Sequence, residues 1–537
     1  MNADFISKTK ELIDGLKSTC ANYGLGNDGN EFKIITQAFL YKFLNDKFGY
    51  EVKKADKKLA NAEKWEVALS KYNKNDYEML LMKVSSARLK KEHLLHNLFN
   101  RQNEADFSKL FDNTLRDIAN YNSDIFSVKT EGGAKVQLFD DVSQFISDQS
   151  KRDDFCRALI NKLVSSSFEA VFDQKYDFFA TIFEYLIQDY NKDGGGKYAE
   201  YYTPHAVSRI MASILVDGPV KNVKCYDPAA GSGTLLMSLA HAIGEDRCSI
   251  YSQDISQKSS GMLRLNLILN NLDHSIQNIV QGNTLEHPYH KDKTGKLQLF
   301  DYIVSNPPFK LDFSDFRDNL DTKANEARFF AGIPNEPPKK KDSMPIYLLF
   351  IQHIMHSLSA KGRAAVVVPT GFLTSQSGIE MAIRKALVDK KMLKGIVSMP
   401  SNIFATTGTN VSVVFIDKAN TGDVVLVDAT KLGTEMKDGR NKKTILSTEE
   451  EARIVNSFRT RKGTEDFSIA VSYESITSKG YSLSAGQYFE VKVEHVEITP
   501  QEFKTRLSEY KVKLTQYFSE ARKLEKEIEK QLENVKL

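Results

Sequence analysis

Seven short apolar runs alternate with segments of helical character between residues 168 and 418, and this alternation constrains the fold more than any other feature. Strands that alternate with helices form a mostly parallel sheet covered by helices on both faces, because parallel strands need long crossover connections. We therefore predict an α/β fold with a doubly wound sheet. The seven predicted strands are residues 223–227, 249–254, 276–281, 302–305, 364–369, 395–399 and 411–417.

A glycine-rich turn, D-P-A-A-G-S-G at residues 227–233, follows the first predicted strand. Gly231 and Gly233 let the backbone turn sharply and approach a ligand closely. The dinucleotide fingerprint is absent because its third glycine is missing. The second predicted strand ends at Asp254, whose carboxylate can accept both hydroxyls of a ribose. A plain loop would explain the glycines alone, but the two features together predict a site for an adenosine-containing cofactor.

A second turn, S-N-P-P-F at residues 305–309, follows the fourth predicted strand. The lone pair of an exocyclic amine is delocalised into its ring, and two acceptors aimed at its N–H groups localise that pair. Asn306 offers a side-chain carbonyl and Pro307 a backbone carbonyl, while Pro307 and Pro308 restrict φ and hold the turn extended. Phe309 offers a flat surface for a base. A strand that merely stops at a Pro-Pro turn is the alternative, which the upstream turn and Asp254 disfavour.

The order D-P-A-A-G-S-G, then S-N-P-P-F, resembles amino-group methyltransferases that use S-adenosylmethionine, specifically N6-adenine DNA methyltransferases. Y-Y-T-P at 201–204, G-N-T-L at 282–285 and A-K-G-R-A-A-V-V at 360–367 look like the modification subunit of type I restriction-modification enzymes. The resemblance covers nearly the whole chain and is strongest from about residue 196 to 418. It implies the Rossmann-like, seven-stranded methyltransferase fold and site-specific methylation of N6 on a flipped adenine.

The resemblance also implies residue roles. Catalysis would depend on Asn306, Pro307, Pro308 and Phe309. Asn283 departs from the Asp that many relatives in the wider superfamily carry after their third strand, so it could accept from the cofactor adenine only as an uncharged amide. The residues implied for cofactor binding are Glu200, Tyr201, Tyr202, Thr203, Pro204, His205, Asp227, Gly231, Ser232, Gly233, Thr234, Asp254 and Asn283.

Two other functions remain open at this point. Glutamine methyltransferases that act on release factors and guanine-N2 RNA methyltransferases carry similar N-P-P-[YF] turns, so the acceptor could be another planar amide or amine. A scaffold that has kept the fold without catalysis is the second possibility. A long helical N-terminal region and a C-terminal coiled coil disfavour the first, and the intact Asn306, Phe309 and Gly231 disfavour the second.

Length and composition predict several domains. With 537 residues and 41% hydrophobic residues, the chain can form two or three substantial cores. We expect an N-terminal helical domain at 1–165, a catalytic domain at 166–420, an extension of that domain at 421–498 and a coiled-coil helix at 499–537. The N-terminal prediction depends on a wide apolar face, formed by Phe32, Ile35, Phe39, Tyr41, Phe43 and Leu44.

Several function classes are disfavoured. The chain has no run of about 18 apolar residues and no secretory signal pattern, so we expect a cytoplasmic protein without a membrane partner. Its four cysteines, Cys20, Cys156, Cys225 and Cys248, lack C-x-x-C spacing, so no metal site is predicted. The G-x-x-x-x-G-K-[ST] motif of ATP-driven motors is also missing.

The last 39 residues predict a helix that assembles with another chain. Thr499, Pro500 and Glu502 form an N-cap, a first-turn proline and a capping box in order. Apolar or small side chains then recur with the alternating 4-3 spacing of a coiled-coil seam, at Phe503, Leu507, Tyr510, Leu514, Tyr517, Ala521, Leu524 and Ile528. A helix folded back on its own domain would show the same stripe, but an intermolecular role is favoured. In the resembled family this end meets the specificity subunit.

The near-balanced net charge of the chain limits how it can bind DNA. A net charge of +3, without a basic helix suited to the major groove, predicts local or shared contact with double-stranded DNA that contains the target adenine. The resemblance implies a specificity subunit, a second copy of this chain bound through it, and an ATP-dependent restriction subunit that can join.

Residues 310–343 are polar and without periodicity, so they predict either a solvated loop or a flap that closes over an extruded base.

Overall fold

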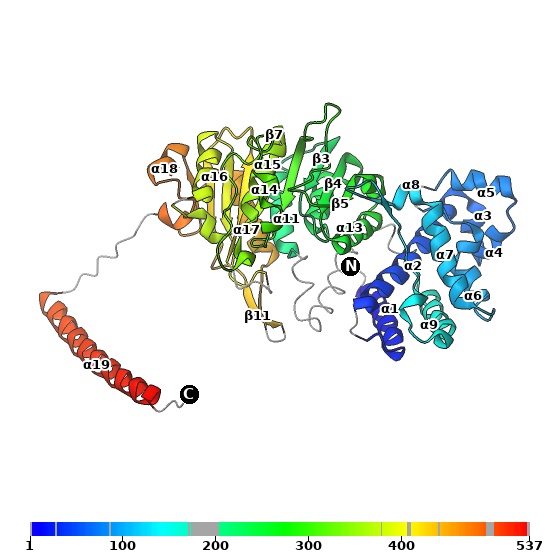
Figure 1. Cartoon of the computed structure of the whole chain (residues 1–537), viewed down its shortest axis with the longest axis horizontal. Coiled ribbons are helices and arrows are strands. Elements are labelled where there is room, and N and C mark those ends of the chain that lie inside the picture. The colour runs from blue at the N-terminus through cyan, green and yellow to red at the C-terminus, as the bar shows by residue number, and fades with distance from the viewer. Residues whose placement is uncertain are drawn as a thin grey trace. The chain divides into compact units, whose positions relative to one another are not determined.

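A computed structural model describes residues 3–26, 29–84, 87–169, 172, 203–376, 378–404, 410–438, 441–489 and 499–533. Contacts divide the chain into two compact units, Met1–Tyr488 and Phe489–Leu537. The first unit runs from blue to orange in Figure 1, and the second contains the red helix α19. The predicted boundaries near residues 165 and 420 fall inside the first unit and stay predictions. Among the described helices, none is long and apolar enough to cross a membrane.

The first unit contains an 11-stranded sheet in the order β13-β10-β8-β9-β7-β6-β3-β4-β5-β1-β2. All seven predicted strands are present in it. They are β3 (Val223–Asp227), β4 (Cys248–Asp254), β5 (Ile279–Gln281), β6 (Phe300–Ser305), β7 (Leu358–Pro369), β8 (Leu393–Ser398) and β9 (Val411–Asp417). The predicted starts differ by up to six residues: β7 begins at Leu358 and not at residue 364, and residues 276–278 end a short 3-10 helix, so that β5 begins only at Ile279.

Four further strands extend the sheet beyond the predicted seven. Two lie on one side, β10 (Val424–Asp428) and β13 (Ser468–Val471), and two on the other, β1 (Val128–Thr130) and β2 (Lys135–Val136). β11 (Thr434–Asp438) and β12 (Asn441–Ile445) form a separate two-stranded sheet. β1 and β2 lie within residues 1–165, so the predicted N-terminal helical region also contributes two short strands to the sheet.

The strand order creates a switch point between β3 and β6. From β3 the chain adds β4 and β5 on one side, then returns to add β6 and β7 on the other, all parallel. Ligands of open α/β sheets bind outside the carboxyl ends of the strands at such a point. β3, β4, β5 and β6 all end at the same edge, which we call the carboxyl edge. β1 also ends there, because it runs parallel to β5.

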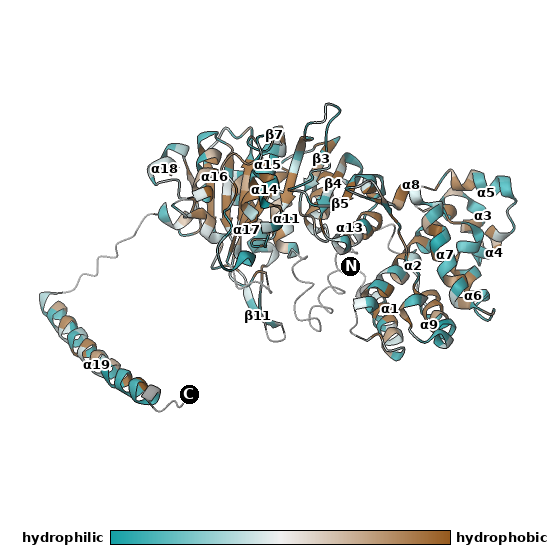
Figure 2. Ribbon diagram, in the orientation of Figure 1, coloured by the Kyte–Doolittle hydropathy of each residue, from teal (hydrophilic) through white to brown (hydrophobic). Residues whose placement is uncertain are grey.

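Helices flank the sheet and bury its strands. The main ones are α11 (His205–Leu215), α12 (Thr234–Ile243), α13 (Gln257–Leu269), α15 (Tyr347–Ser357), α16 (Gly378–Asp389), α17 (Thr448–Thr460) and the shorter α18 (Tyr473–Ser478). Every residue of β8 and β9 is buried, and Figure 2 shows apolar strands between helices that carry polar residues. Strands covered on both faces read as continuous apolar runs, which explains why the sequence revealed them.

The N-terminal region forms a helical bundle on a shared core. Its helices are α1 (Ala3–Asn22), α2 (Gly29–Ala55), α3 (Lys57–Ala60), α4 (Trp65–Ser70), α5 (Lys74–Leu81), α6 (Leu95–Asn100), α7 (Phe107–Tyr121), α8 (Ser123–Phe126) and α9 (Arg152–Val164). The predicted apolar face of α2 is confirmed, because all six of its residues are buried. In α7 the buried Phe107, Phe111, Leu115 and Ile118 follow helical spacing on one face.

Residues 310–343 combine a largely exposed loop with a small packed core. They contain α14 (Ser314–Leu320). Three of their apolar side chains, Phe313, Leu320 and Phe329, form a small separate core with Leu285, Met344, Ile346, Leu349 and Phe350, whereas Leu311 and Phe330 are exposed. The sequence did not predict this core, because apolar residues at irregular spacing reveal no face until α15 and the turn after β5 supply the rest of it.

The second unit contains the predicted C-terminal helix, α19 (Pro500–Glu533). Its capping box is confirmed, since Glu502 N donates to Thr499 Oγ1 at 3.3 Å and Thr499 N donates to Glu502 Oε2 at 2.8 Å. The apolar seam is exposed along its length. Its exposed fractions run from 42% at Leu507 to 62% at Tyr517.

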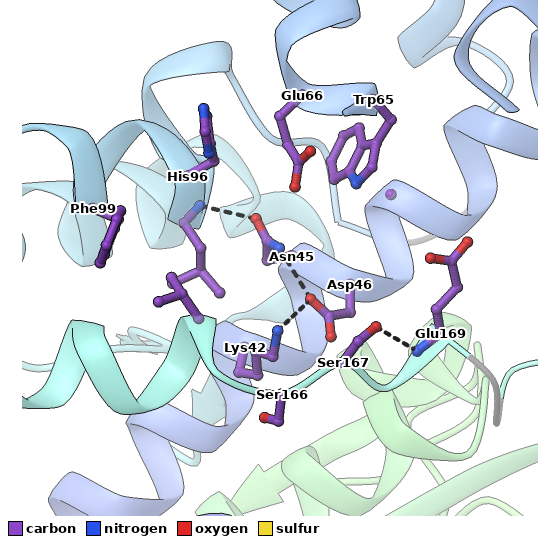
Figure 3. Close-up of a pocket in the computed structure, with 13 residues that line it drawn as sticks. Lys42, Asn45, Asp46, Trp65, Glu66, His96, Phe99, Ser166, Ser167 and Glu169 are labelled. Carbon is purple, nitrogen blue, oxygen red and sulfur yellow. Dashed lines mark hydrogen bonds and ion pairs between the residues drawn. The ribbon is translucent and has the colours of Figure 1, made fainter. Parts of the chain in front are cut away.

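A buried ion pair on α2 holds the point where the chain leaves the bundle. Lys42 Nζ and Asn45 Nδ2 donate to Asp46 Oδ1 at 3.0 and 3.1 Å, and Phe168 N donates to Asp46 Oδ2 at 2.8 Å. A cavity of about 410 Å³ opens beside this group, with Trp65 in its wall (Figure 3). The Asp46 carboxylate thus satisfies three donors at once, one of them charged.

Replacing Asp46 with alanine should lower the free energy of unfolding by about 3–5 kcal/mol, because a buried ammonium loses its counter-charge. Urea unfolding followed by circular dichroism would measure the change. The matched control is Glu78→Ala, which removes an exposed pair with Lys74 and should cost under about 1 kcal/mol. Equal losses in the two variants would contradict a structural role for the buried pair.

Candidate active site

A hydrogen bond joins the two predicted turns at the carboxyl edge. Ser305, the last residue of β6, donates from Oγ to Asp227 Oδ1 at 2.9 Å, and Asp227 is the last residue of β3. The same oxygen accepts from Ala229 N at 2.9 Å. The glycine turn (residues 227–233) and the catalytic turn (residues 305–309) therefore share a buried carboxylate at their base.

Burial raises the pKa of Asp227 to about 7, and the nearby Asp254 carboxylate adds to the shift. The hydrogen bonds from Ala229 and Ser305 act in the opposite direction because they favour the charged form. The pKa of Asp254 is likewise raised by burial. Perturbed carboxyl groups cluster at functional sites, so the two at this strand edge mark it as a candidate site.

The glycine turn is closed by Asp254. Gly231 N donates to Asp254 Oδ2 at 2.9 Å and Ser256 N donates to Oδ1 at 2.8 Å. Gly231 and Gly233 both have positive φ, at 53° and 85°. A Cβ at Gly233 would lie 2.2 Å from Leu263 Cδ1, so the Leu263 side chain on α13 would have to move, and the positive φ would be strained for any other residue. The turn thus brings bare backbone to the start of α12, a geometry that suits a polar ligand.

The catalytic turn is oriented by Thr203. Asn306 Nδ2 donates to the buried Thr203 Oγ1 at 3.3 Å. Because the amide nitrogen is held there, Asn306 Oδ1 is the atom left to accept a substrate N–H. Phe309 is half-buried, and its ring meets Tyr347 edge-on at 6.3 Å. Pro307 is buried and Pro308 is exposed.

Asn283 is placed at the end of β5 but its side chain is already engaged. Asn283 Oδ1 accepts from Leu285 N at 3.1 Å and from Glu286 N at 3.4 Å. This pattern is an Asx turn, in which the side chain replaces a backbone acceptor. The implied contact between Asn283 and a cofactor adenine therefore competes with two local donors.

The remaining predicted residues divide into two groups. Thr203, Pro204 and His205 lead into α11 at the same edge, and Ser232 and Thr234 flank Gly233 with their hydroxyls 3.0 Å apart. The predicted Glu200, Tyr201 and Tyr202 lie outside the described residues.

Sequence reasoning missed the buried Arg328. Its guanidinium donates to the carbonyls of Thr284 and Leu285 at 2.8 and 2.7 Å, and its Nε donates to His353 Nδ1 at 3.0 Å. Burial lowers its pKa to about 10. His353 in turn lies 3.2 Å from the Tyr226 hydroxyl. No motif could reveal this network, since Arg328 lies in a polar segment and all its partners are distant in sequence.

A second cavity, of about 600 Å³, lies where α2, β1, β2 and α13 meet. Gln281 lines it, and this residue pairs with Asp254 in the β4–β5 register. In the described part of the chain, no three His, Cys, Asp or Glu side chains cluster as metal ligands would.

The family model described as N-6 DNA Methylase matches residues 174–497, more than half of the chain. The chain belongs to this family. Among solved structures, this N-6 DNA methylase superposes on the type I restriction-modification methyltransferase subunit from Streptococcus thermophilus with a TM-score of 0.71 and 21% identity, covering 90% of this chain and 99% of that one. That likeness confirms the predicted fold.

Curated relatives agree with the resemblance that the motifs indicated. The type I restriction enzyme MpnII methylase subunit of Mycoplasma pneumoniae is 29% identical over 60% of this chain and 59% of its own length. The MjaIX methylase subunit of Methanocaldococcus jannaschii is 28% identical over 70% of this chain and 66% of its own length. The chain thus spans less than two thirds of the length of each of these two relatives.

The raised pKa of Asp227 predicts a pH dependence of stability. The folded protein holds a proton on Asp227 up to about pH 7, whereas the unfolded chain releases it near the ordinary value of 3.8. The contribution of this group to the free energy of unfolding therefore falls as pH rises from about 4 to 7, and is constant above that.

Asp227→Asn cannot titrate, so its stability relative to the parent should rise across the same window, by on the order of a few kcal/mol. Urea unfolding at a series of pH values would measure the difference. Parallel profiles for parent and variant between pH 4 and 7 would show that the Asp227 pKa is not raised.

Proposed function

We propose that this methylase transfers a methyl group from S-adenosylmethionine to the N6 amine of adenine in double-stranded DNA, as the modification subunit of a type I restriction-modification complex. The observation that supports it most is the Ser305–Asp227 hydrogen bond, which brings the catalytic turn beside the glycine turn. A methyl donor bound at one turn and an amine bound at the other would then be neighbours, so that most of the entropic cost of bringing them together is met on binding.

The residues at the carboxyl edge fit the proposed cofactor. S-adenosylmethionine supplies an electrophilic methyl group on a positively charged sulfonium. Gly231 and Gly233, both at positive φ, let the backbone turn sharply at the start of α12, and the Asp254 carboxylate keeps lone pairs on both oxygens for ribose hydroxyls in addition to its two backbone donors. Asp227 and Asp254 place negative charge, or groups ready to acquire it, near the cation.

Asn306 and Pro307 activate the acceptor amine. Asn306 Oδ1 and the Pro307 carbonyl oxygen accept the two N–H groups of N6, which draws the nitrogen lone pair out of the ring and toward the methyl group. Thr203 holds the Asn306 amide so that its oxygen, not its nitrogen, faces the substrate. The preorganised acceptors stabilise the positive charge that develops on N6 as the N–CH3 bond forms and the S–CH3 bond breaks. S-adenosylhomocysteine is the leaving group, and the methylated N6 then releases a proton to solvent.

The target adenine has to leave the duplex because its N6 is otherwise paired inside the helix. Phe309 provides the surface on which the extruded base stacks, and Tyr347 supports that ring from its edge. The packed segment 310–343 follows directly, so the base side of the site is built on a small core of its own.

Asn306→Ala should lower methyl transfer by a factor of about 100 or more while leaving the affinity for S-adenosylhomocysteine within about threefold of the parent, because the amide acts on the acceptor only. Incorporation of tritiated methyl groups into unmethylated DNA, with the specificity subunit co-expressed, measures the first quantity. Calorimetry measures the second.

The matched control is Asn113→Ala, an exposed asparagine of α7 that contacts Arg116. It should keep both the rate and the affinity. A parent-like rate in Asn306→Ala would reject the assigned role, and methyl incorporation by the parent into protein or RNA instead of DNA would reject the substrate.

We propose that α19 docks the methylase on its specificity subunit. Its seam is exposed over the whole described helix, and knobs-into-holes packing with a partner helix would bury it. The specificity subunit would hold two copies of the methylase, and an ATP-dependent restriction subunit can join the assembly. Sequence selection would then belong to the partner, which agrees with the small net charge of +3.

Leu514→Glu on the seam should abolish co-purification with the specificity subunit and site-specific methylation, because a charge would have to enter the coiled-coil interface. Val512→Glu, which is equally apolar and 68% exposed but off the seam, should preserve both. Deleting residues 499–537 should behave as Leu514→Glu does, with cofactor binding and thermal unfolding of the first unit unchanged. Selective methylation by the purified single chain would contradict the docking role.

A further inference from the structure

Glu131 belongs to the N-terminal region but lies at the carboxyl edge of the sheet. It follows β1, and its N–H donates to the Gln281 carbonyl at 2.9 Å, which continues the pairing of β1 with β5 by one residue. Its Oε2 accepts from Asn283 N at 2.9 Å. Gly282 makes room for it, since a Cβ there would lie 2.3 Å from Oε2. The chain thus places a carboxylate directly over the end of β5.

This carboxylate keeps an acceptor to spare. Glu131 is exposed, and in the described part of the chain only its Oε2 receives a hydrogen bond. The amide oxygen of Asn283, in contrast, already accepts hydrogen bonds from two backbone N–H groups of its own turn. An amine arriving at this strand end would therefore find its strongest acceptor in Glu131.

The strand order predicts which part of the cofactor would lie at the end of β5. Along the carboxyl edge the catalytic turn follows β6, the glycine turn follows β3, Asp254 ends β4, and Asn283 and Glu131 follow β5 and β1. If the methyl group lies toward Asn306 and the ribose at Asp254, the nucleobase continues in the same direction, to β5 and β1. The exocyclic amine of the adenine would then lie beside Asn283 and Glu131.

We propose that Glu131 is a specificity-determining residue of the cofactor site, whose free carboxylate oxygen accepts the adenine amino group of S-adenosylmethionine. The inference rests on the proposed cofactor. It assigns to the N-terminal region a direct part in cofactor recognition, and it provides at the end of β5 the negative charge that Asn283 lacks.

The test compares two ligands that differ in the base alone. S-adenosylhomocysteine carries the amine, and S-inosylhomocysteine carries a carbonyl oxygen in its place. By calorimetry the full-length parent should bind the adenine form at least about tenfold more tightly, since a charge-assisted hydrogen bond is replaced by two opposed acceptors. In Glu131→Gln the preference should fall below about threefold, because an amide can donate to the carbonyl as readily as it accepts from the amine.

Glu286→Gln is the matched control, because Glu286 is the other carboxylate at this turn and its Oε1 accepts from Asn319. It should keep the preference of the parent. Glu131→Gln retains a carbonyl for Asn283 N, so an unchanged unfolding midpoint is expected alongside.

Three results would overturn the inference: an unchanged preference in Glu131→Gln, an equal loss of affinity for both ligands, which marks a structural contact only, or loss of the preference in Glu286→Gln instead. Failure of the parent to bind S-adenosylhomocysteine would refute the proposed cofactor itself, which separates the two proposals.

Discussion

The site depends on the carboxylate of Asp227 and the hydroxyl of Ser305, which join two strand ends that are 78 residues apart in sequence. A parallel sheet aligns the carboxyl ends of its strands, but alignment alone leaves the turns after them free to diverge. The shared hydrogen bond fixes the base of both turns, and a buried carboxyl group that also receives Ala229 N cannot easily be replaced. Chemistry between ligands on the two turns requires this kind of fixed distance.

Asp254 and Arg328 extend the same principle to the neighbouring turns. Asp254 ties the glycine turn to the end of β4, and Arg328 ties the turn after β5 to α15 through His353. Arg328 also anchors the segment that follows the catalytic turn. Its buried guanidinium is satisfied by two carbonyl oxygens and a ring nitrogen, so displacement of this segment would leave a charge without partners. The turn after β5 and the segment 310–343 are therefore held together by one buried side chain, that of Arg328.

The N-terminal region is more than a helical attachment. β1 joins the sheet beside β5, and Glu131 carries the pairing beyond the strand to the end of the neighbouring turn. The fold of a catalytic domain and the fold of the bundle thus meet within one compact unit.

The amino-acid sequence by itself determined the features that depend on neighbours in the chain: seven buried strands read as apolar runs, two turns read as strand endings, and the Thr499–Glu502 cap opens α19. Tertiary structure alone decided which distant groups meet. It placed Ser305 on Asp227, folded the polar residues 310–343 around Phe313 and Phe329, and brought β1 to β5. The physical reason is the sequence range of each interaction. Periodicity and capping depend on residues that are close in the chain. Whether an irregularly placed apolar residue or a lone carboxylate is buried depends on distant residues that pack against it.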